Sequence, residues 1–386
     1  MAEAKYWNGD IPWVSSGEMT QRKIRNTDLR VTEDGANEGS KRIPARTVLV
    51  VVRGMSLAKE FRVAITAREV TFNQDLKALL PSKKLNPEFL FYYLLSQNHP
   101  IRDSASESAH GTKKLDTQVL EEWPVPLPSL SIQTKIVAAL SAYDDLIENN
   151  RRRIALLEKM AEELYREWFV RMRFPGHKQV KKVKGVPDGW KPICLESIVK
   201  FTMGQSPSSE FYNENGDGLP FHQGVGTYGE RFPRTVTYCS EDGRRAHAGD
   251  ILFSVRAPVG RLNIADQEMI IGRGLAAIRH KKERNSYLYY LLKVAFANED
   301  IIGNGSIFNS VGKDELAKFP IFEPESFLIE KFDVIASKMD EQIAMLMKAS
   351  DCLRSSRDAL LPRLISGKLS VEHLDIQFPP GMEEAA

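Results

Sequence analysis

The most regular hydrophobic pattern covers two long stretches, one in the middle of the chain and one near its C-terminus. Apolar residues recur there at alternating intervals of four and three, the heptad period of helices that pack along a narrow seam. The pattern predicts two long helices. The first seam contains Ile136, Leu140, Tyr143, Ile147, Asn150, Ile154, Leu157 and Leu164, and the second contains Phe332, Met339, Ile343, Leu346, Leu353 and Leu360.

The two seams are related by an offset of 196 residues. Two such helices in one chain bury their seams most economically against each other, so we expect an antiparallel coiled coil with Asn150 fixing the register. Packing of each helix on its own domain alone is the alternative. The first helix is expected to start after Ser129 and to end near Pro175. The second is expected to end at Gly367, and Pro362 predicts a kink or an early end within it.

The rest of the chain repeats with the helices, although the offset drifts where loops differ in length. Thr47–Arg53 resembles Asp250–Arg256, and Ile11–Trp13 resembles Leu219–Phe221. The expected fold is therefore α+β, with two tandem globular domains in a pseudo-twofold internal repeat, separated by the two helices. The expected strands are Thr47–Arg53, Arg62–Thr66, Asp250–Arg256 and Gly274–Arg279, and the expected shorter helices are Pro87–Ser96 and Ser286–Val294.

The expected domain boundaries follow from these elements. They are a first globular domain at 1–128, a first helix at 129–174, a second globular domain at 175–325, a second helix at 326–372 and a tail at 373–386. The first domain is short at its N-terminus, because only eleven residues precede Pro12 where the second has a segment containing Gly204-Gln205-Ser206-Pro207. We expect either a start further upstream or an altered first domain.

Composition excludes several classes of protein. No apolar run reaches the length of a membrane span, and the first ten residues do not resemble a signal peptide, so a cytoplasmic protein is expected. Cys194, Cys239 and Cys352 lack metal-site spacing and are most simply buried thiols. Net charge is +2, but residues 170–185 carry six Lys or Arg and no acid, which fits either a solvated linker or a surface that faces phosphates.

The sequence contains no convincing catalytic motif. Gly224-Val-Gly-Thr-Tyr-Gly229 fits the dinucleotide-binding pattern formally, but Glu230-Arg-Phe-Pro-Arg follows in place of a helix. There is no phosphate-binding loop, no His ligand spacing and no Asn-Pro-Pro-Tyr motif of adenine methyltransferases. We therefore expect a chain that is not an enzyme and holds neither a metal nor a cofactor.

Several segments resemble one family, the specificity subunits of type I restriction–modification systems. They are Gly249–Arg256, the exit Leu120–Pro128, Ile132-Gln133 at the start of the first helix, and the closing segment Arg357–Leu369. The resemblance covers roughly residues 9–372 and is specific in combination with the duplication. It implies two target-recognition domains that read a bipartite target in double-stranded DNA, with an unread spacer set by the helices.

The resemblance also implies the partners and their cofactors. Two modification subunits would supply adenine N6-methylation with S-adenosylmethionine, and restriction subunits would supply translocation and cleavage with ATP and Mg. An orphan scaffold that binds partners without full DNA specificity is the alternative, and a stand-alone nuclease or methyltransferase is disfavoured by the missing motifs.

Base reading requires Arg, Lys, Asn, Gln or Ser side chains that reach base edges, with other basic groups on phosphates. The DNA-binding candidates are Ser15, Ser16, Arg53, Lys59, Lys113 and Lys114 in the first domain, and Gln205, Ser206, Gln223, Arg256, Arg261, Arg273, Ser306 and Asn309 in the second.

Overall fold

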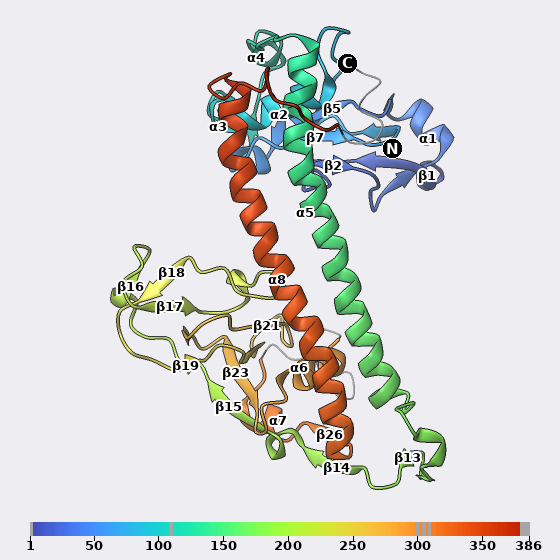
Figure 1. The fold of residues 1–386 in the computed structure, drawn as a ribbon, viewed down its shortest axis with the longest axis vertical. Helices are drawn as coiled ribbons and strands as arrows, with labels where there is room; N and C mark the ends of the chain where they lie inside the picture. The colour runs from blue at the N-terminus through green and yellow to red at the C-terminus, as the bar shows by residue number, and fades with distance from the viewer. Residues whose placement is uncertain (1–2, 108–110, 298–300, 303–305, 308–309, 379–386) are drawn as a thin grey trace. The chain divides into compact units, whose positions relative to one another are not determined.

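The computed structural model describes residues 3–107, 111–297, 301–302, 306–307 and 310–378 (Figure 1). The chain divides into unit 1, which is Met1–Asn149 with Ala349–Ala386, and unit 2, which is Asn150–Lys348. Each unit combines sheets with helices, which confirms the α+β content expected from the sequence. Within the described ranges, no helix has the length and apolar character that a membrane crossing requires.

Unit 1 is built on two four-stranded sheets, in the orders β3-β1-β8-β4 and β2-β7-β5-β9, and a three-stranded sheet, β10-β11-β6. Its strands are β1 (Trp7–Val14), β2 (Lys23–Ile24), β3 (Arg30–Val31), β4 (Lys41–Ile43), β5 (Val48–Val51), β6 (Arg53–Gly54), β7 (Val63–Thr66), β8 (Val70–Phe72), β9 (Leu76–Leu79), β10 (Ser106–Glu107) and β11 (Lys113–Lys114). Its shorter helices are α1 (Glu33–Glu38), α2 (Pro87–Ser96), α3 (Asn98–Asp103) and α4 (Thr117–Glu121).

The central strand β5 divides the core of unit 1 into two layers. Val48 and Val50 face the cluster that contains α2, whereas Leu49 and Val51 face the cluster beneath the β1–β8 sheet. This alternation follows from the two-residue period of a strand that is buried on both faces. Helix α2 begins where the Asn86 side chain accepts hydrogen bonds from the N–H groups of the first turn, and it packs on β5 and β7 (Figure 1).

Unit 2 has the same kind of core. Its sheets are β15-β23-β20-β21, β16-β18-β17-β22-β19, β14-β26, β12-β13 and β24-β25. The strands are β12 (Lys182–Val183), β13 (Val186–Pro187), β14 (Lys191–Cys194), β15 (Val199–Met203), β16 (Tyr212–Asn213), β17 (Leu219–His222), β18 (Thr237–Cys239), β19 (Arg245–Ala246), β20 (Ile251–Ser254), β21 (Leu262–Ile264), β22 (Met269–Ile271), β23 (Leu275–His280), β24 (Ile301–Ile302), β25 (Ser306–Ile307) and β26 (Pro320–Glu323).

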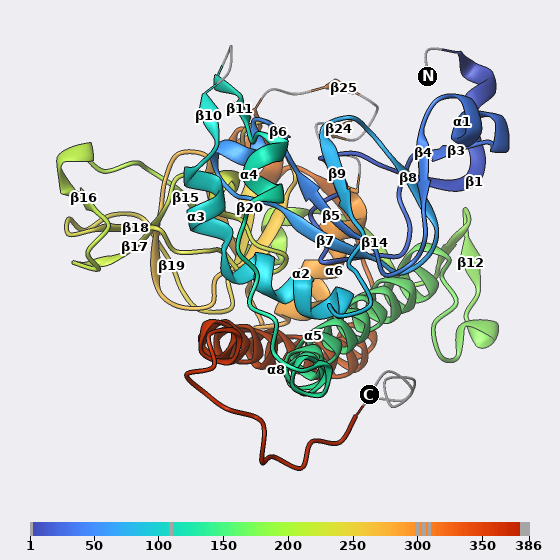
Figure 2. The same cartoon turned by 90° about the horizontal axis from the view of Figure 1, so that it is seen from above.

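The helices of unit 2 lie on one side of its sheets. Helix α6 (Asn285–Ala295) packs on β21 and β23, and α7 (Lys313–Ala317) precedes β26. Strands β16, β17 and β18 lie on the side away from α6 (Figure 2). Ile251 and Phe253 of β20 face the cluster with α6, and Leu252 faces the cluster with β22. The pattern of β5 in unit 1 is therefore repeated.

The two predicted long helices are present as α5 (Leu130–Tyr165) and α8 (Ser326–Ile365). Helix α5 continues into one π-helical turn, η4 (Arg166–Val170). Helix α8 runs past Pro362 to Ile365, so Pro362 does not end it early, and it ends before Gly367, which has a φ of +73°, as predicted. Pro362 removes its own i→i−4 hydrogen bond, and because α8 ends three residues later, this disruption is confined to the last turn.

Every predicted seam residue is buried or half-buried. In unit 2, Ile154 of α5 forms one cluster with Ile343 and Leu346 of α8. In unit 1, Leu140 of α5 and Leu364 of α8 belong to one core. Each unit thus contains a segment of both helices, and these segments pack in the core of that unit.

Backbone hydrogen bonds relate the two units residue by residue. Strands β1 and β8 of unit 1 pair in parallel as β17 and β22 do in unit 2. Val52 N donates to Asp75 O (2.9 Å) as Val255 N donates to Gly274 O (3.0 Å). The described part of unit 1 has no counterpart of β15, which pairs with β23 in unit 2. Strand β15 lies in the segment of the second half that has no match in the sequence of the first half.

Candidate nucleic-acid interface

Three loops cross at one point of unit 2, beyond the ends of the parallel strands β17 and β22. Gly272 N donates to His222 O (2.9 Å), and Gly274 N donates to Gln223 O (3.1 Å). A Cβ on Gly272 would lie 2.5 Å from Oε1 of Gln223, and one on Gly274 would lie 2.5 Å from its carbonyl oxygen. Glycine is required at both positions because no side chain fits between the backbones.

The third loop follows β15. Gln205 N donates to Ile271 O (3.0 Å), and a Cβ on Gly204 would lie 2.1 Å from the carbonyl oxygen of Gly272. These contacts bring Gln205, Ser206, Gln223 and Arg273 into one small region. Each of these four residues was predicted from the sequence as a DNA-binding candidate.

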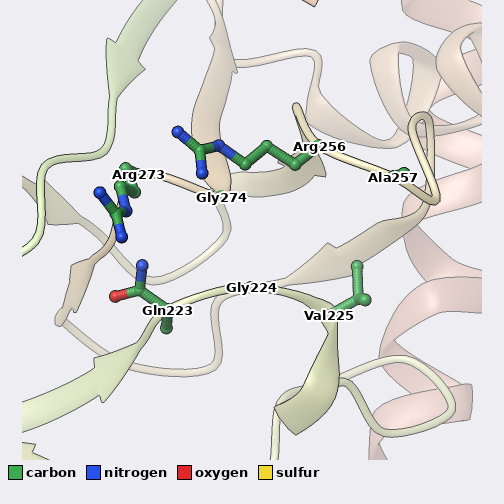
Figure 3. A pocket seen from close by; sticks show the side chains of 7 residues that line it. All are labelled: Gln223, Gly224, Val225, Arg256, Ala257, Arg273 and Gly274. Carbon is green, nitrogen blue, oxygen red and sulfur yellow. The ribbon is translucent and has the colours of Figure 1, made fainter. Parts of the chain in front are cut away.

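A cavity of about 240 Å³ opens where the loops cross. It is lined by Gln223, Gly224, Val225, Arg256, Ala257, Arg273 and Gly274. Figure 3 shows that the Arg256 side chain reaches toward Arg273 from one side and that the Gln223 amide points toward Arg273 from the other. Arg256 follows β20, so the cavity gathers polar side chains from three different parts of the sheet layers.

The side chain of Gln223 is held in place by Ser206. Ser206 Oγ accepts a hydrogen bond from the backbone N–H of Arg273 (3.3 Å) and donates one to Oε1 of Gln223 (2.8 Å). The amide NH₂ of Gln223 therefore remains available as a donor. Since Gln223 is exposed, the amide can meet a ligand in the cavity.

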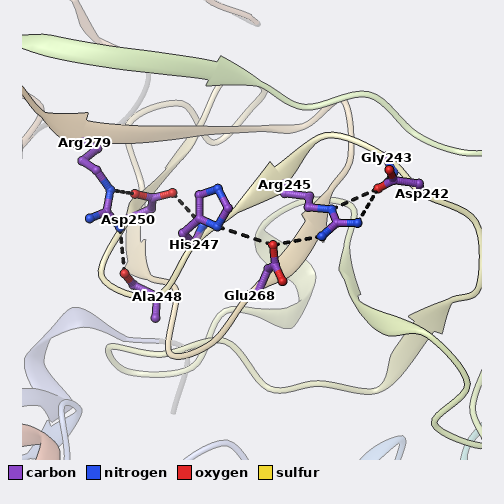
Figure 4. Close-up of polar contacts among 8 residues, drawn as sticks. All are labelled: Asp242, Gly243, Arg245, His247, Ala248, Asp250, Glu268 and Arg279. Carbon is purple, nitrogen blue, oxygen red and sulfur yellow. Dashed lines mark hydrogen bonds and ion pairs between the residues drawn. The ribbon is translucent and has the colours of Figure 1, made fainter.

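Arg256 and Arg273 differ from the other arginines nearby in their partners. Both are exposed, and neither forms an ion pair within the described part of the chain. Figure 4 shows Arg245 in contact with Asp242 and Glu268, and Arg279 in contact with Asp250. Arg279 also contacts Glu283. The guanidinium groups at the cavity are thus available to bind an anionic or acceptor-rich ligand, whereas the paired arginines stabilise the sheet edge.

A buried histidine at the end of β17 immediately precedes Gln223. His222 is fully buried, and burial lowers its pKa to about 4, so the imidazole is neutral at pH 7. Its Nδ1 lies 2.8 Å from Oγ1 of Thr227, which donates to Gly224 O (3.4 Å). This segment, which includes Gly224–Gly229, is a loop with a single 3-10 turn, η8 (Val225–Thr227), in agreement with the rejection of a dinucleotide-binding motif.

The backbone correspondence places several candidates of unit 1 at equivalent positions. Ser15 corresponds to Gln223, and Arg53 corresponds to Arg256. Arg53 pairs with Lys114 and Gly54 pairs with Lys113 in the β6–β11 ladder, so the basic residues share one small sheet. Lys114 contacts Asp116 at 3.1 Å. The structure therefore gathers Arg53, Lys113 and Lys114, while Lys59 lies in the turn after η2 (Ser56–Ala58).

Sequence reasoning missed Gln74. It is exposed and occupies the position of Arg273, because Phe72 and Ile271 are equivalent in the parallel strand pairs. The offset between the halves is 199 residues at this strand, so the comparison at 196 did not align the two residues. Aligning β8 with β22 by their Val-Thr-Phe and Met-Ile-Ile triplets would have found it.

The remaining candidates lie outside the cavity. Arg261 is exposed, and its backbone N–H donates to Oγ of Ser254 (2.8 Å). Ser16 accepts a hydrogen bond from Arg62 through its carbonyl oxygen (3.2 Å). Ser306 belongs to β25, of which only the backbone is described, and Asn309 lies outside the described residues.

Metal chemistry finds no support in the described residues, among which no group of three His, Cys, Asp or Glu side chains is placed to hold an ion. The three cysteines are free, but the expectation that all are buried is wrong. Cys352 is exposed because it lies beside the seam position Leu353 on α8, and Cys194 is half-buried at the end of β14.

Comparison with known proteins identifies a family that matches both halves of the chain. The model of the type I restriction modification DNA specificity domain matches residues 1–159 and 187–346, once in each half. A putative type I restriction enzyme MjaX specificity subunit of Methanocaldococcus jannaschii is 32% identical over 77% of this chain and 72% of its own length. The MjaIX specificity subunit of the same organism is 28% identical over 96% of this chain and 89% of its own.

A solved structure shows the same fold. The type I restriction-modification S subunit from M. genitalium matches with a TM-score of 0.57 and 19% identity, over 94% of this chain and 91% of that one. The family match covers both halves of the repeat. The chain therefore belongs to the family of DNA specificity subunits of type I restriction-modification systems, the non-catalytic subunits of these enzymes.

Proposed function

We propose that the chain reads a bipartite target in double-stranded DNA, one half with each unit, and positions modification and restriction subunits on it. The observation that carries the proposal is the cavity of unit 2, where Gln223, Arg256 and Arg273 converge. In this proposal the target-recognition domains are residues 1–128 and 175–325, and the spacer helices are 129–174 and 326–372, followed by the tail at 373–386.

The side chains of the cavity suit base reading. A guanidinium recognises guanine through N7 and O6, and a glutamine amide recognises adenine through N6 and N7. The three crossing loops fix the backbones that carry these groups, which limits the conformational freedom lost on binding. Gln205 and Ser206 belong to the crossing loop that follows β15 and are assigned here to support of the cavity. Arg261, which lies outside the cavity, is assigned to the DNA backbone.

Unit 1 would read the other half with Ser15, Arg53 and Gln74, and with Lys113 and Lys114 on phosphates. Without a counterpart of β15, its described part offers no polar turn equivalent to Gln205-Ser206. A second candidate function is that the chain binds its partners but reads only the half-site of unit 2.

The spacer is proposed to be an antiparallel coiled coil of α5 and α8. Support comes from the seam residues that pack together inside each unit, such as Ile154 with Ile343 and Leu346. Asn150 is buried on the same seam, where an amide tolerates few alternative registers. A rigid spacer of this kind would set the separation of the two half-sites.

Exposed apolar side chains on the helices support partner binding. Leu156 and Met160 of α5 are 60% and 54% exposed, and Met345 of α8 is 64% exposed. Residues four apart lie on one face of a helix, so Leu156 and Met160 offer a continuous apolar surface. We assign this kind of surface to two modification subunits, which would bring S-adenosylmethionine, while ATP and Mg would belong to restriction subunits. Such a complex would act in the cytoplasm, where the DNA is.

Co-expression with the modification subunits encoded beside this chain, followed by sequencing of adenine methylation across a plasmid, tests the proposal. A methylated motif of two half-sites with a fixed spacer is expected. Methylation at a single half-site would favour the second candidate. Assembly without any methylation would overturn both candidates, because each assigns DNA recognition to at least one unit.

A further inference from the structure

A buried arginine connects the Gln223 loop of unit 2 to the long helices. Arg231 is 1% exposed and lies eight residues after Gln223. Its guanidinium contacts Asp340 of α8 and lies 3.3 Å from Glu158 of α5. It also stacks on Tyr289 of α6, with its central carbon 4.5 Å from the ring centroid. One side chain thus contacts three helices within unit 2.

Asp340 is the centre of this junction. Ser286 Oγ donates to it (2.6 Å), and so does the hydroxyl of Tyr290 (3.1 Å). Burial raises the pKa of Asp340, while Arg231 opposes that shift. The same carboxylate raises the pKa of Arg231 above its ordinary value although burial alone would lower it. The Arg231 guanidinium therefore favours the ionised form of Asp340, which burial alone would disfavour.

Unit 1 contains the corresponding junction. Arg22 lies 3.4 Å from Asp144 of α5, which also contacts Arg357 of α8 and accepts a hydrogen bond from Tyr92 (2.7 Å). Asp144 and Asp340 are related by the 196-residue offset of the repeat. Arg22 O accepts from Ile65 N (2.9 Å) as Arg231 O accepts from Ile264 N (2.9 Å), so the two arginines occupy equivalent backbone positions.

The segment between Gln223 and Arg231 is short and internally braced. Arg234 N donates to Thr227 O (2.7 Å), and Gly229 N donates to Phe232 O (3.1 Å). Asn263 of β21 donates to Gly229 O (3.2 Å). Because these bonds hold the segment together, we expect a shift of Arg231 relative to α8 to move the loop that carries Gln223.

We propose that Arg231, and Arg22 in unit 1, are positioning residues that fix the orientation of each DNA-reading loop against the long helices. The proposal rests on the proposed function. The proposal goes beyond that function in one respect. One arginine–aspartate junction in each unit would set the angle at which a half-site is read, and hence the spacer length that the complex accepts.

Stability alone is a poor explanation of this junction. Buried ion pairs stabilise a fold little more than apolar residues of the same size, because the desolvation of both charges opposes their attraction. Nε of Arg231 is buried with no hydrogen-bond partner among the described residues, which adds to that penalty. The directional contacts of the guanidinium with Asp340 and Glu158 define an orientation, which an apolar contact would not do.

The test compares variants in the complex with the modification subunits, on plasmids whose two half-sites are separated by the native spacer or by one base pair more or less. Arg231→Met alone leaves Asp340 without its cation and is expected to lower the melting temperature. The double variant Arg231→Met with Asp340→Asn removes both charges and is expected to melt near the wild type, because the amide oxygen accepts from one of the Ser286 and Tyr290 hydroxyls and the amide NH₂ donates to the other.

In the double variant, we expect the preference for the native spacer to fall by roughly tenfold, which corresponds to about 1.4 kcal/mol. A merely structural defect would lower methylation of all spacers equally. Arg231→Lys, which retains a cation near Asp340, is expected to restore part of the preference. Arg284→Met is the matched control, because Arg284 contacts Glu330 of α8 at 3.0 Å but does not belong to the reading loop.

The wild-type and variant profiles answer different questions. If the wild-type complex methylates no bipartite motif, the proposed function fails and this inference falls with it. If the wild type methylates one but the folded double variant keeps the same spacer preference, the positioning role is overturned while the proposed function stands.

Discussion

Ser206 and Gln223 form the shortest side-chain contact between two of the loops at the cavity, with Ser206 Oγ 2.8 Å from Oε1 of Gln223. The backbone N–H of Arg273 occupies an acceptor position of the same hydroxyl. The serine proton is therefore directed to the glutamine oxygen, and the glutamine NH₂ is presented outward. This relationship gives the cavity a fixed donor, which is what discrimination between bases requires.

Replacement of Ser206 by Ala is expected to relax discrimination at the half-site read by unit 2. The amide of Gln223 loses its orientation, and the loss of one hydrogen bond of this kind is worth about 1 kcal/mol, or roughly a fivefold change in preference. Binding to duplexes with single base changes in that half-site measures the effect. Ser209→Ala, a nearby exposed serine of η7 (Ser209–Phe211), is the control. An unchanged base preference in Ser206→Ala would remove Ser206 from the assignment.

Replacement of Arg256 by Gln is expected to weaken specific binding by about 1–3 kcal/mol, because a free guanidinium at the cavity is lost. Arg245→Gln removes the same charge from an arginine that already contacts Asp242 and Glu268 and is expected to have a smaller effect. Titration of the modification complex with a specific duplex at constant salt measures both. Equal losses in the two variants would show that overall charge, and not the cavity, determines affinity.

In unit 1, the change Gln74→Ala is expected to relax one half of the bipartite motif and to leave the half read by unit 2 intact. Gln74 occupies the position of Arg273, and glutamine is a base-reading residue type. Sequencing of methylated sites gives both halves in one experiment. Gln118→Ala is the control, since the amide of Gln118 on α4 donates to the Glu122 side chain (2.8 Å). Relaxation of the opposite half, or of neither, would contradict the equivalence of the two units at this loop.

The fold could be predicted where the pattern is local. Heptad spacing predicted α5 and α8, and the runs around Val48–Val51 and Ile251–Ser254 predicted the central strands, because period and β-branching depend on nearby residues. The cavity was predicted in part, since Gln205 follows a glycine, and Arg273 lies between two glycines, that the crossing of the loops requires. Proximity of Arg256 to them depends on strand order, which no local pattern contains.

The junction at Arg231 could not be predicted. Its partner Asp340 is 109 residues away, and an arginine between Glu230 and Phe232 has the sequence context of a surface loop. Only the packing of α6 and α8 against the loop buries it. Gln74 was missed for a different reason, because loop lengths shift the repeat offset from 196 to 199 at that strand.

The variant Met160→Asp is expected to prevent stable assembly with a modification subunit while the chain itself remains folded. Met160 is exposed, so the substitution leaves the core of unit 2 unchanged. If a partner covers it, a carboxylate would be buried without a cation, at a cost of several kcal/mol. Co-purification with the modification subunit and circular dichroism of the free chain measure the two effects. Leu29→Asp, at an exposed leucine away from the long helices, is the control. Loss of assembly in both variants would contradict a partner-binding site on α5.

The stability of unit 2 is expected to fall in mildly acidic solution because of two buried histidines. Burial lowers the pKa of His222 to about 4, and burial lowers that of His280 to about 4 as well. Between pH 6.5 and 4 the unfolded chain binds more protons than the folded one, so the free energy of unfolding decreases as pH falls through this range. The slope is at most about 1.4 kcal/mol per pH unit for each histidine.

Denaturant unfolding at pH 7.5 and pH 5.5 measures this dependence, and the variant His222→Asn isolates one contribution to it. Asparagine cannot be protonated there, and its side chain can still approach Thr227, whose hydroxyl lies 2.8 Å from Nδ1 of His222. The difference in unfolding free energy between the two pH values should therefore be smaller in His222→Asn than in the wild type. His99→Gln, at an exposed histidine, should leave the difference unchanged. An equal pH dependence in wild type and His222→Asn would mean that His222 is protonated at pH 5.5 in the folded protein as it is in the unfolded chain. Protonation would require a hydrogen-bond partner for its buried Nε2, and none lies within the described residues.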